Sequence, residues 1–345
     1  MTNICPTLPL IDLHRHLDGN IRLETILDIG REYNLPLPAW DLDGLRPHVQ
    51  VTEPQPGVMA FISKFNWMMQ AMVNPEACRR AAYENVEDAA REGLDYVELR
   101  FSPWFMAEPH SLDPAAVTEA VCDGAAAGER DFGLRTQLIG IISRTYGPQV
   151  GWQELQALLT QKERIAGLDL AGDEAHFPAV WFEEHFRAGR EAGWQATVHA
   201  GEIAGPESIW NAIRLLGARR IGHAVAALAD PALMDFMAEQ GVAIEGNLTS
   251  NLQTMTVASY DAHPIRAFLQ RGLCVTLNTD DPGISAIDLI YEYDVAAPAA
   301  GLSQEQIWRC QENGLRAAFL GDVEKEALRR RKAEAVRPSE RQADG

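Results

Sequence analysis

The sequence predicts a single α/β barrel, the (β/α)8 or TIM-barrel architecture, with additional helices. Short apolar or β-branched runs alternate with amphipathic helical stretches along the 345 residues, which favours a parallel sheet. Eight such runs can be counted, and this number favours closure into a barrel over an open sheet. The length also fits one barrel of ~250 residues plus insertions.

The expected strands are short apolar runs that are bounded by glycine or polar residues. They occupy residues 8–14, 96–102, 136–143, 165–172, 195–199, 220–223, 242–247 and 274–278. Such continuous apolar character is typical of parallel strands that are buried on both faces.

The expected helices lie between these strands, and several begin with proline in the first turn, where its missing N–H costs nothing. They occupy residues 75–92, 114–130, 180–192, 206–216, 231–240 and 264–271. Two regions exceed the strand–helix repeat. Residues 15–94 contain more helix than one crossover needs, and residues 54–67 can form a lid over the barrel mouth. The region from residue 303 onward is also expected to be helical.

We expect one barrel domain over residues 1–336. Residues 337–345 are polar and have almost nothing to bury, so they predict a flexible tail. With 46% hydrophobic and 23% charged residues, the composition is typical of a globular protein with a sizeable core. No run approaches the ~20 apolar residues that span a bilayer.

The net charge of −19 argues against partners that are bound through basic surfaces, so we expect neither nucleic acid nor membrane as a partner. The five cysteines are widely spaced and contain no C-x-x-C motif, which predicts neither a disulfide framework nor a cysteine metal site. The N-terminus shows no basic region followed by an apolar one. These features favour a cytoplasmic protein with a small-molecule substrate, and they leave monomer and homodimer both open.

Chemically distinctive residues follow the predicted strands at the point where each strand ends. In a parallel barrel these ends share one face, and barrel enzymes carry their chemistry on that face. The residues follow six of the eight strands and lie in His14–Gly19, Asp169–Glu174, His199–Glu202, Gly222–His223, Thr249–Asn251 and Asn278–Pro282.

His14 and His16 are separated by one residue, so on a strand both imidazoles point to the same side. Such histidines can also form a hydrogen-bonded pair at a strand end. Together with His199 and Asp280 at other strand ends, however, they indicate a metal site. Imidazole nitrogen and carboxylate oxygen suit Zn²⁺, so we expect one zinc ion per subunit.

Glu202 lies three residues after His199, which places a carboxylate near the metal without making it a ligand. A carboxylate there can move protons to and from an activated water. His223 can hydrogen-bond the same water, although an isolated Gly-His pair is often a core histidine. Asp280 and Asp281 can diverge, one toward the metal and one toward the ligand, although two aspartates before a proline also suit a turn.

Asp18 indicates the class of substrate. A carboxylate near the metal accepts a hydrogen bond from a hydroxyl but repels a phosphate, which favours a nucleoside over a nucleotide. The alternative is an N-cap for the following helix. The chain contains neither a phosphate-loop motif nor G-x-S-x-G.

With these residues assembled, the chain resembles the adenosine deaminase family of metal-dependent hydrolases, in its bacterial branch. The matching segments, in family order, are DLHRHLDGNIR (12–22), YVELRFSP (96–103), LDLAGDE (168–174), TVHAGE (197–202), RIGH (220–223), LTSN (248–251) and LNTDDP (277–282). The combination of HxHLDG, HAGE and NTDDP is highly specific. The resemblance implies hydrolytic deamination of adenosine and 2′-deoxyadenosine to inosine and 2′-deoxyinosine with release of ammonia, in purine salvage.

The resemblance also implies a role for each residue at the metal and the reacting carbon. Glu202 would give its proton to purine N1. His223 would orient the attacking water and assist its deprotonation. The ligands of one catalytic zinc ion would be His14, His16, His199 and Asp280.

Four residues would bind the substrate by the same resemblance. Asp281 would hydrogen-bond purine N7, and Gly172 would present its backbone to N3. Asp18 would bind the ribose 5′-hydroxyl, and His16 would contact the substrate as well as the metal.

Two positions depart from the family pattern. Ala224 stands where members usually carry glycine, and Asn247 stands where they often carry cysteine. Both positions bear on substrate preference. The rival hypotheses are a deaminase of the same barrel group that acts on adenine or a purine nucleotide, a two-metal amidohydrolase, and a purine nucleoside sensor without activity. No predicted strand ends in the lysine that a two-metal site usually needs, and a sensor would be expected to lack Glu202 or a ligand.

Overall fold

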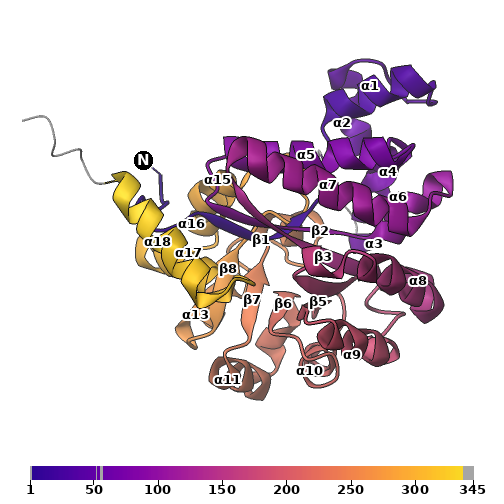
Figure 1. Cartoon of the computed structure of the whole chain (residues 1–345). Helices are drawn as coiled ribbons and strands as arrows, with labels where there is room; N and C mark the ends of the chain where they lie inside the picture. The colour runs from indigo at the N-terminus through magenta and orange to yellow at the C-terminus, as the bar shows by residue number, and fades with distance from the viewer. Residues whose placement is uncertain (1, 52, 55–56, 337–345) are drawn as a thin grey trace, which may run out of the picture.

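The structure is a computed structural model and describes residues 2–51, 53–54 and 57–336. Within this part of the chain, eight parallel strands are arranged in the order β1 to β8 and form the predicted barrel, with helices around its outside (Figure 1). The strands are β1 Ile11–His16, β2 Tyr96–Phe101, β3 Arg135–Ser143, β4 Gly167–Ala171, β5 Gln195–Ala200, β6 Arg220–His223, β7 Ala243–Gly246 and β8 Cys274–Leu277.

The barrel closes between β1 and the residues that follow β8. His16 N donates to Asp280 O at 2.7 Å, and Asp280 N donates to His14 O at 2.8 Å. A parallel bridge also joins Arg15 to Asp280. The closure of the barrel therefore places Asp280 beside both histidines of β1.

The helices that cover the strands agree with the expected pattern. The main ones are α5 Pro75–Arg91, α7 Pro114–Phe132, α8 Gly147–Leu159, α9 Glu183–Glu191, α10 Pro206–Arg214, α11 Pro231–Gln240, α13 Ile265–Gln270, α17 Gln304–Ala317 and α18 Asp322–Val336. A 3₁₀ turn, Ala179–Phe182, precedes α9, so the helix predicted at 180–192 is in fact two elements. A capping box of Ser303 and Gln306 begins α17, and in Figure 1 α17 and α18 lie beside the N-terminus.

The region before β2 holds the extra helices that its length predicted. These are α1 Leu23–Tyr33, α2 Leu42–Val49, α3 Val58–Ile62 and α4 Asn66–Gln70. Residues 55–56 of the expected lid and the predicted tail at 337–345 lie outside the described residues. Short helices also follow β2, β7 and β8: α6 Pro103–Ala107, α12 Leu248–Gln253, α14 Pro282–Ser285, α15 Leu289–Tyr291 and α16 Ala297–Ala299.

The predicted first strand was placed too early. β1 begins at Ile11, which pairs with Tyr96 at the start of β2, and it continues to His16, which pairs with Arg100. The residues before Ile11 have no neighbouring strand, and Leu10 N donates instead to Asp95 Oδ2 at 2.8 Å. The other strand ends agree with prediction to within two residues, and β6 agrees at both ends.

The apolar core lies between the strands and the helices, whereas the barrel interior contains charged residues. In β2, Val97, Leu99 and Phe101 belong to the apolar core, and Glu98 and Arg100 alternate with them. All five side chains are fully buried. None of the described helices has the length and apolar character needed to cross a membrane.

Candidate active site

A cavity opens at the carboxyl ends of the strands, where the sequence predicts the chemistry. Eight of the nine predicted site residues line it: His16, Asp18, Gly172, His199, Glu202, His223, Asp280 and Asp281. The ninth, His14, is fully buried next to them. The fold therefore brings together residues that lie far apart in the sequence. For example, the hydrogen bond from Thr279 Oγ1 to Asp12 Oδ2 joins residues that are 267 positions apart.

Four donor atoms converge beside the cavity. His199 Nε2 lies 3.1 Å from His14 Nε2 and 3.3 Å from His16 Nε2. Asp280 Oδ1 lies 3.1 Å from His14 Nε2 and 3.4 Å from His16 Nε2. Bonds of ~2.0–2.1 Å in a tetrahedral zinc site place neighbouring ligand atoms ~3.3 Å apart, and these four of the six separations between the atoms are close to that value.

The other ring nitrogen of each of these histidines faces a carboxylate. His14 Nδ1 donates to Glu245 Oε2 at 2.6 Å. His199 Nδ1 is 3.0 Å from Asp169 Oδ2, and His16 Nδ1 is 3.3 Å from Asp18 Oδ1. A hydrogen on Nδ1 leaves a lone pair on Nε2, which is the arrangement of metal-bound histidines.

The electrostatics of the three imidazoles are unequal. Burial lowers the pKa of His199 to about 3, so this ring is neutral and ready to bind a cation. For His16, burial is outweighed by the carboxylates of Asp281, Asp18 and Asp280, which raise its pKa to about 9. A metal must displace a proton from His16, as metal binding to protein ligands commonly does.

A second grouping of possible ligands overlaps the first. Ligand atoms of His14, His199, His223 and Asp280 lie within 4.8 Å of one another. His223 differs from the other histidines, because its Nδ1 faces the amide Nδ2 of Asn251 at 3.0 Å rather than a carboxylate. Its Nε2 is 3.7 Å from both Asp280 Oδ2 and Glu202 Oε2.

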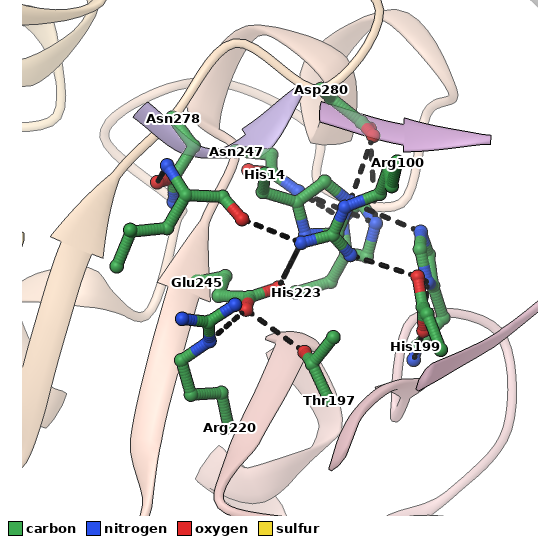
Figure 2. A network of polar contacts seen from close by, with 12 residues as sticks. His14, Arg100, Thr197, His199, Arg220, His223, Glu245, Asn247, Asn278 and Asp280 are labelled. Carbon is green, nitrogen blue, oxygen red and sulfur yellow. Dashed lines mark hydrogen bonds and ion pairs between the residues drawn. The ribbon is translucent and has the colours of Figure 1, made fainter. Parts of the chain in front are cut away.

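One arginine links the carboxylates behind two of the histidines (Figure 2). Arg100 donates from Nη1 to Asp169 Oδ2 at 2.8 Å and from Nη2 to Glu245 Oε2 at 3.0 Å. Arg220 Nε donates to the other oxygen of Glu245 at 2.6 Å. The sequence analysis missed these residues. The available signal was the presence of charged residues inside otherwise apolar strands, as in β2 and β7.

Glu202 is held by its backbone and free at its carboxyl group. The N–H groups of residues 201–204 donate to the carboxylate of Glu174 at 2.6–3.1 Å, which fixes the loop after β5. Burial raises the pKa of the Glu202 carboxyl to about 7. This group therefore exchanges a proton near neutral pH, which is the property of an efficient general acid. Glu174 is a further residue that the sequence analysis did not assign.

Asp281 keeps a buried oxygen without a partner. Its Oδ1 has no hydrogen bond within the described part of the chain. Burial and the neighbouring Asp280 raise the pKa of Asp281 well above its usual value. A Cβ on Gly19 would lie 1.8 Å from Asp281 Oδ1, so glycine in the LDG segment makes room for this carboxyl group.

Positive backbone φ angles at three residues shape the rest of the site. Gly172 has a φ of +107°, and a Cβ there would lie 2.4 Å from Thr145 Oγ1. His223 and Asp280 have φ values of 66° and 63°, in the left-handed region that non-glycine residues rarely adopt. Such strain is common where a fold aims a side chain into an active site.

One side of the cavity is apolar. The expected lid contributes through α3 and the turn after it, and α6 adds a further ring. The apolar side chains that line the cavity here are Val58, Phe61, Ile62, Phe65 and Phe105. The combination of an apolar wall and a few convergent polar groups is typical of a small-molecule site.

Comparisons with known proteins identify the family of this chain. The family model described as Adenosine deaminase matches residues 9–335. An adenosine deaminase of Salmonella typhimurium is 58% identical over 329 residues, which is 95% of this chain and 99% of that protein. One from Klebsiella pneumoniae is 59% identical over 327 residues, covering 95% of this chain and 98% of that protein.

Solved structures share the fold at lower identity. An adenine deaminase from Arthrobacter aurescens superposes with a TM-score of 0.88 at 24% identity, over 95% of this chain and 99% of that one. An N6-mAMP deaminase from Arabidopsis has a TM-score of 0.80 at 24% identity, over 95% of this chain and 98% of that one. Because both the family model and the relatives span nearly the whole chain, the protein belongs to the adenosine deaminase family and is a hydrolase.

Proposed function

We propose that the enzyme uses one Zn²⁺ per subunit to convert adenosine and 2′-deoxyadenosine to inosine and 2′-deoxyinosine with release of ammonia. We also propose that residues 1–336 form one barrel domain, that the protein is cytoplasmic and that it acts in purine salvage. The single observation that carries it is the convergence of four donor atoms, with four of their six separations at 3.1–3.4 Å and a carboxylate behind each imidazole.

We assign the zinc ligands to His14, His16, His199 and Asp280. Each of these histidines has its Nδ1 against a carboxylate and its Nε2 among the four converging donor atoms, whereas His223 does not. When bound, zinc supplies Lewis acidity that lowers the pKa of a water from ~15.7 toward ~7. The donor set contains no thiolate, which is also compatible with a catalytic rather than a structural site.

Glu202 is the proton donor to purine N1. Its raised pKa keeps a substantial fraction of the carboxyl group protonated at neutral pH, so it can donate to a ring nitrogen that only accepts. A proton on N1 draws electrons from the ring and makes C6 electrophilic. Water then adds at C6, and the amino group leaves as ammonia. His223 faces the same space from β6, within 3.7 Å of Glu202, and orients that water.

Asp281 binds purine N7 as a protonated acid. N7 carries a lone pair and no hydrogen, so a partner at N7 has to donate. Because its pKa is raised, the Asp281 carboxyl group retains the hydrogen that it donates, and its Oδ1 has no hydrogen-bond partner within the described residues. A carboxylic acid that stays neutral in a buried site so that it can donate is a known device of enzymes.

Gly172 and Asp18 position the remaining parts of the nucleoside. Gly172 lacks a side chain next to the cavity, so its backbone can approach N3 closely. Asp18 is buried, and Oδ2 accepts from Ser102 N at 3.1 Å while Oδ1 faces His16. The remaining lone pairs of this carboxylate can accept from the ribose 5′-hydroxyl, and its charge disfavours a 5′-phosphate.

The first test compares three purines. The purified protein is analysed for metal, and the ultraviolet change from adenosine to inosine is followed with adenine and AMP in parallel. We expect about one zinc per subunit and fast turnover of adenosine that chelation abolishes and zinc restores. Adenine and an AMP derivative are named in the titles of the two solved structures above, so turnover of either in preference to adenosine would overturn the assignment of Asp18.

A further inference from the structure

A chain of hydrogen bonds runs behind His223 into the protein. Asn251 Nδ2 is 3.0 Å from His223 Nδ1, and Asn251 Oδ1 is 3.2 Å from His263 Nε2. His263 Nδ1 in turn accepts from the backbone N–H of Ile265 at 3.1 Å. All three side chains are buried, with exposed fractions of 1%, 0% and 4% for His223, Asn251 and His263.

The direction of this chain is fixed at its inner end. A backbone N–H only donates, so His263 Nδ1 must accept and carries no hydrogen. Burial lowers the pKa of His263 to about 3, so the ring is neutral and its one hydrogen is on Nε2. That hydrogen is donated to Asn251 Oδ1. The amide of Asn251 is thereby oriented with Nδ2 toward His223, and it donates to Nδ1.

The reversed amide would fail at both ends of Asn251. Turning it over would place Nδ2 against the Nε2–H of His263, where two donors would face each other. The second amide near the ring leaves the direction unchanged. Asn247 Nδ2 is 3.4 Å from both ring nitrogens of His223. At equal distances an in-plane position would collide with Cε1, so this amide lies over the ring face.

We propose that His263 and Asn251 are positioning residues that hold His223 in the tautomer with its hydrogen on Nε2. In this tautomer His223 is a hydrogen-bond donor on the cavity side. It binds the oxygen of the water that adds to C6 and, unlike the role that the resemblance implies, does not accept the proton of that water. That proton passes to the carboxylate of Glu202, which has given its own proton to N1. The proposal rests on the assignment of His223 to this water, and it adds the two residues that decide which way the hydrogen bond runs.

The direct test is the position of the hydrogen in the zinc-loaded, full-length protein. Long-range ¹H–¹⁵N NMR spectra of protein labelled with ¹⁵N-histidine distinguish a ring nitrogen that carries hydrogen from one that does not. We expect both His223 and His263 to be Nε2–H tautomers. A hydrogen on Nδ1 of His223 in the unsubstituted protein would overturn the proposal. This result does not depend on activity, so it is separate from a failure of the proposed function.

Variants then test the two positioning residues. Asn251→Asp replaces the donor by an acceptor of the same shape, so we expect the His223 hydrogen to move to Nδ1. The kcat for adenosine should fall by about 10²-fold, which is the lower limit of the effect expected when a positioned acid–base group is lost. KM and zinc content should stay close to those of the unsubstituted enzyme. If the tautomer moves and kcat is unchanged, His223 does not act as a donor.

Two variants of His263 remove and then restore its hydrogen bond to Asn251, and a variant of another histidine is the control. His263→Leu leaves Asn251 free to turn over, so we expect mixed tautomers of His223 and a kcat about tenfold lower. His263→Gln retains a side-chain N–H toward Asn251 Oδ1 and should restore most of both signals. His48→Leu changes an exposed histidine and controls for the loss of an imidazole. Equal losses in the Leu and Gln variants would show that His263 only fills space, which would overturn its positioning role.

Discussion

The polar side chains on the two sides of the cavity differ in whether they have hydrogen-bond partners. On the metal side, His14, His16 and His199 each have Nδ1 against a carboxylate. On the substrate side and within the described residues, Asp281 Oδ1 has no partner, and the Glu202 carboxyl group, 3.7 Å from His223 Nε2, accepts no hydrogen bond.

This difference distinguishes side chains that are arranged to bind a metal ion from side chains whose polar atoms remain available for the substrate. An engaged Nδ1 fixes the tautomer and direction of an imidazole before the metal arrives. A buried polar atom without a partner costs about 1–3 kcal/mol, and that cost is recovered only when a ligand supplies the missing bond. In the proposed function, the unpaired groups of Asp281 and Glu202 are therefore the ones assigned to polar contacts with the nucleoside.

The largest effect is expected when Glu245, the carboxylate behind His14 on the metal side of the cavity, is replaced. This carboxylate accepts from His14, Arg100 and Arg220, so Glu245→Gln leaves two buried arginines short of charge. We expect the free energy of unfolding to fall by about 3–5 kcal/mol. The affinity for zinc should also fall about 10–100-fold. Denaturant unfolding at saturating zinc and a competition titration with a chelator measure the two effects.

Glu76→Gln is the matched control, because Glu76 is exposed and pairs only with Arg79 on the surface. Surface pairs of this kind contribute about 0–1 kcal/mol. Unchanged zinc affinity in Glu245→Gln would mean that the carboxylate behind His14 does not prepare it as a ligand.

Replacement of Glu202, on the substrate side of the cavity, should leave zinc binding unchanged. Glu202→Gln retains the shape of the side chain but cannot give a proton to N1, so we expect kcat to fall by about 10³-fold. Zinc content and nucleoside binding should remain. Glu239→Gln, on the exposed face of α11, is the control. Turnover near the rate of the unsubstituted enzyme would exclude Glu202 as the proton donor.

The pH dependence should report the same group. The pKa of Glu202 is raised to about 7, and the protonated form is the active one. The kcat/KM for adenosine is therefore expected to be highest below about pH 7 and to fall by about tenfold per pH unit well above it. A profile that rises through this range would mean that the deprotonated carboxylate is the active form.

A smaller effect is expected when Asp281 is changed to a neutral donor. The amide of Asp281→Asn can still donate to N7, so we expect kcat/KM to fall by no more than about tenfold. Asp281→Ala removes the donor and should lose about tenfold more. If the two variants are equally impaired, Asp281 does not act on the substrate as a donor, and the comparison between the two sides weakens.

The sequence predicts the barrel well because strand–helix alternation is a local property. It also predicts which residues gather at the mouth, since the carboxyl ends of parallel strands share one face. It places β1 three residues early, because the start of that strand depends on where β2 begins, and this is a long-range property. The order of strand ends survives such errors, so the nine predicted residues still gather at the cavity.

The residues behind the site could not be predicted in the same way. Arg100, Asp169 and Glu245 lie on three strands, and nothing local indicates that one guanidinium joins two carboxylates. His263 lies in a loop far from the predicted strand ends, and its function depends on a single backbone N–H. Such contacts follow from tertiary packing and need coordinates.

The smallest expected effect concerns Ala224, which departs from the family pattern and has a φ of 54°. Left-handed backbone costs a non-glycine residue about 1–2 kcal/mol. Ala224→Gly removes that cost but loses a buried methyl group worth about 0.8 kcal/mol and adds about 0.5–1 kcal/mol of chain entropy. The terms nearly cancel, so we expect unfolding free energy to change by less than about 0.5 kcal/mol.

Ala227→Gly is the matched control, since Ala227 is equally buried three residues later and is not among the residues with positive φ. It loses the methyl group and gains chain entropy without relief of strain, so denaturant unfolding should show a loss of about 1.5 kcal/mol. Equal losses in the two variants would mean that the turn after β6 carries no strain at Ala224. A near-neutral Ala224→Gly would instead explain how the chain tolerates alanine next to His223, because the buried methyl group offsets the strain of the turn.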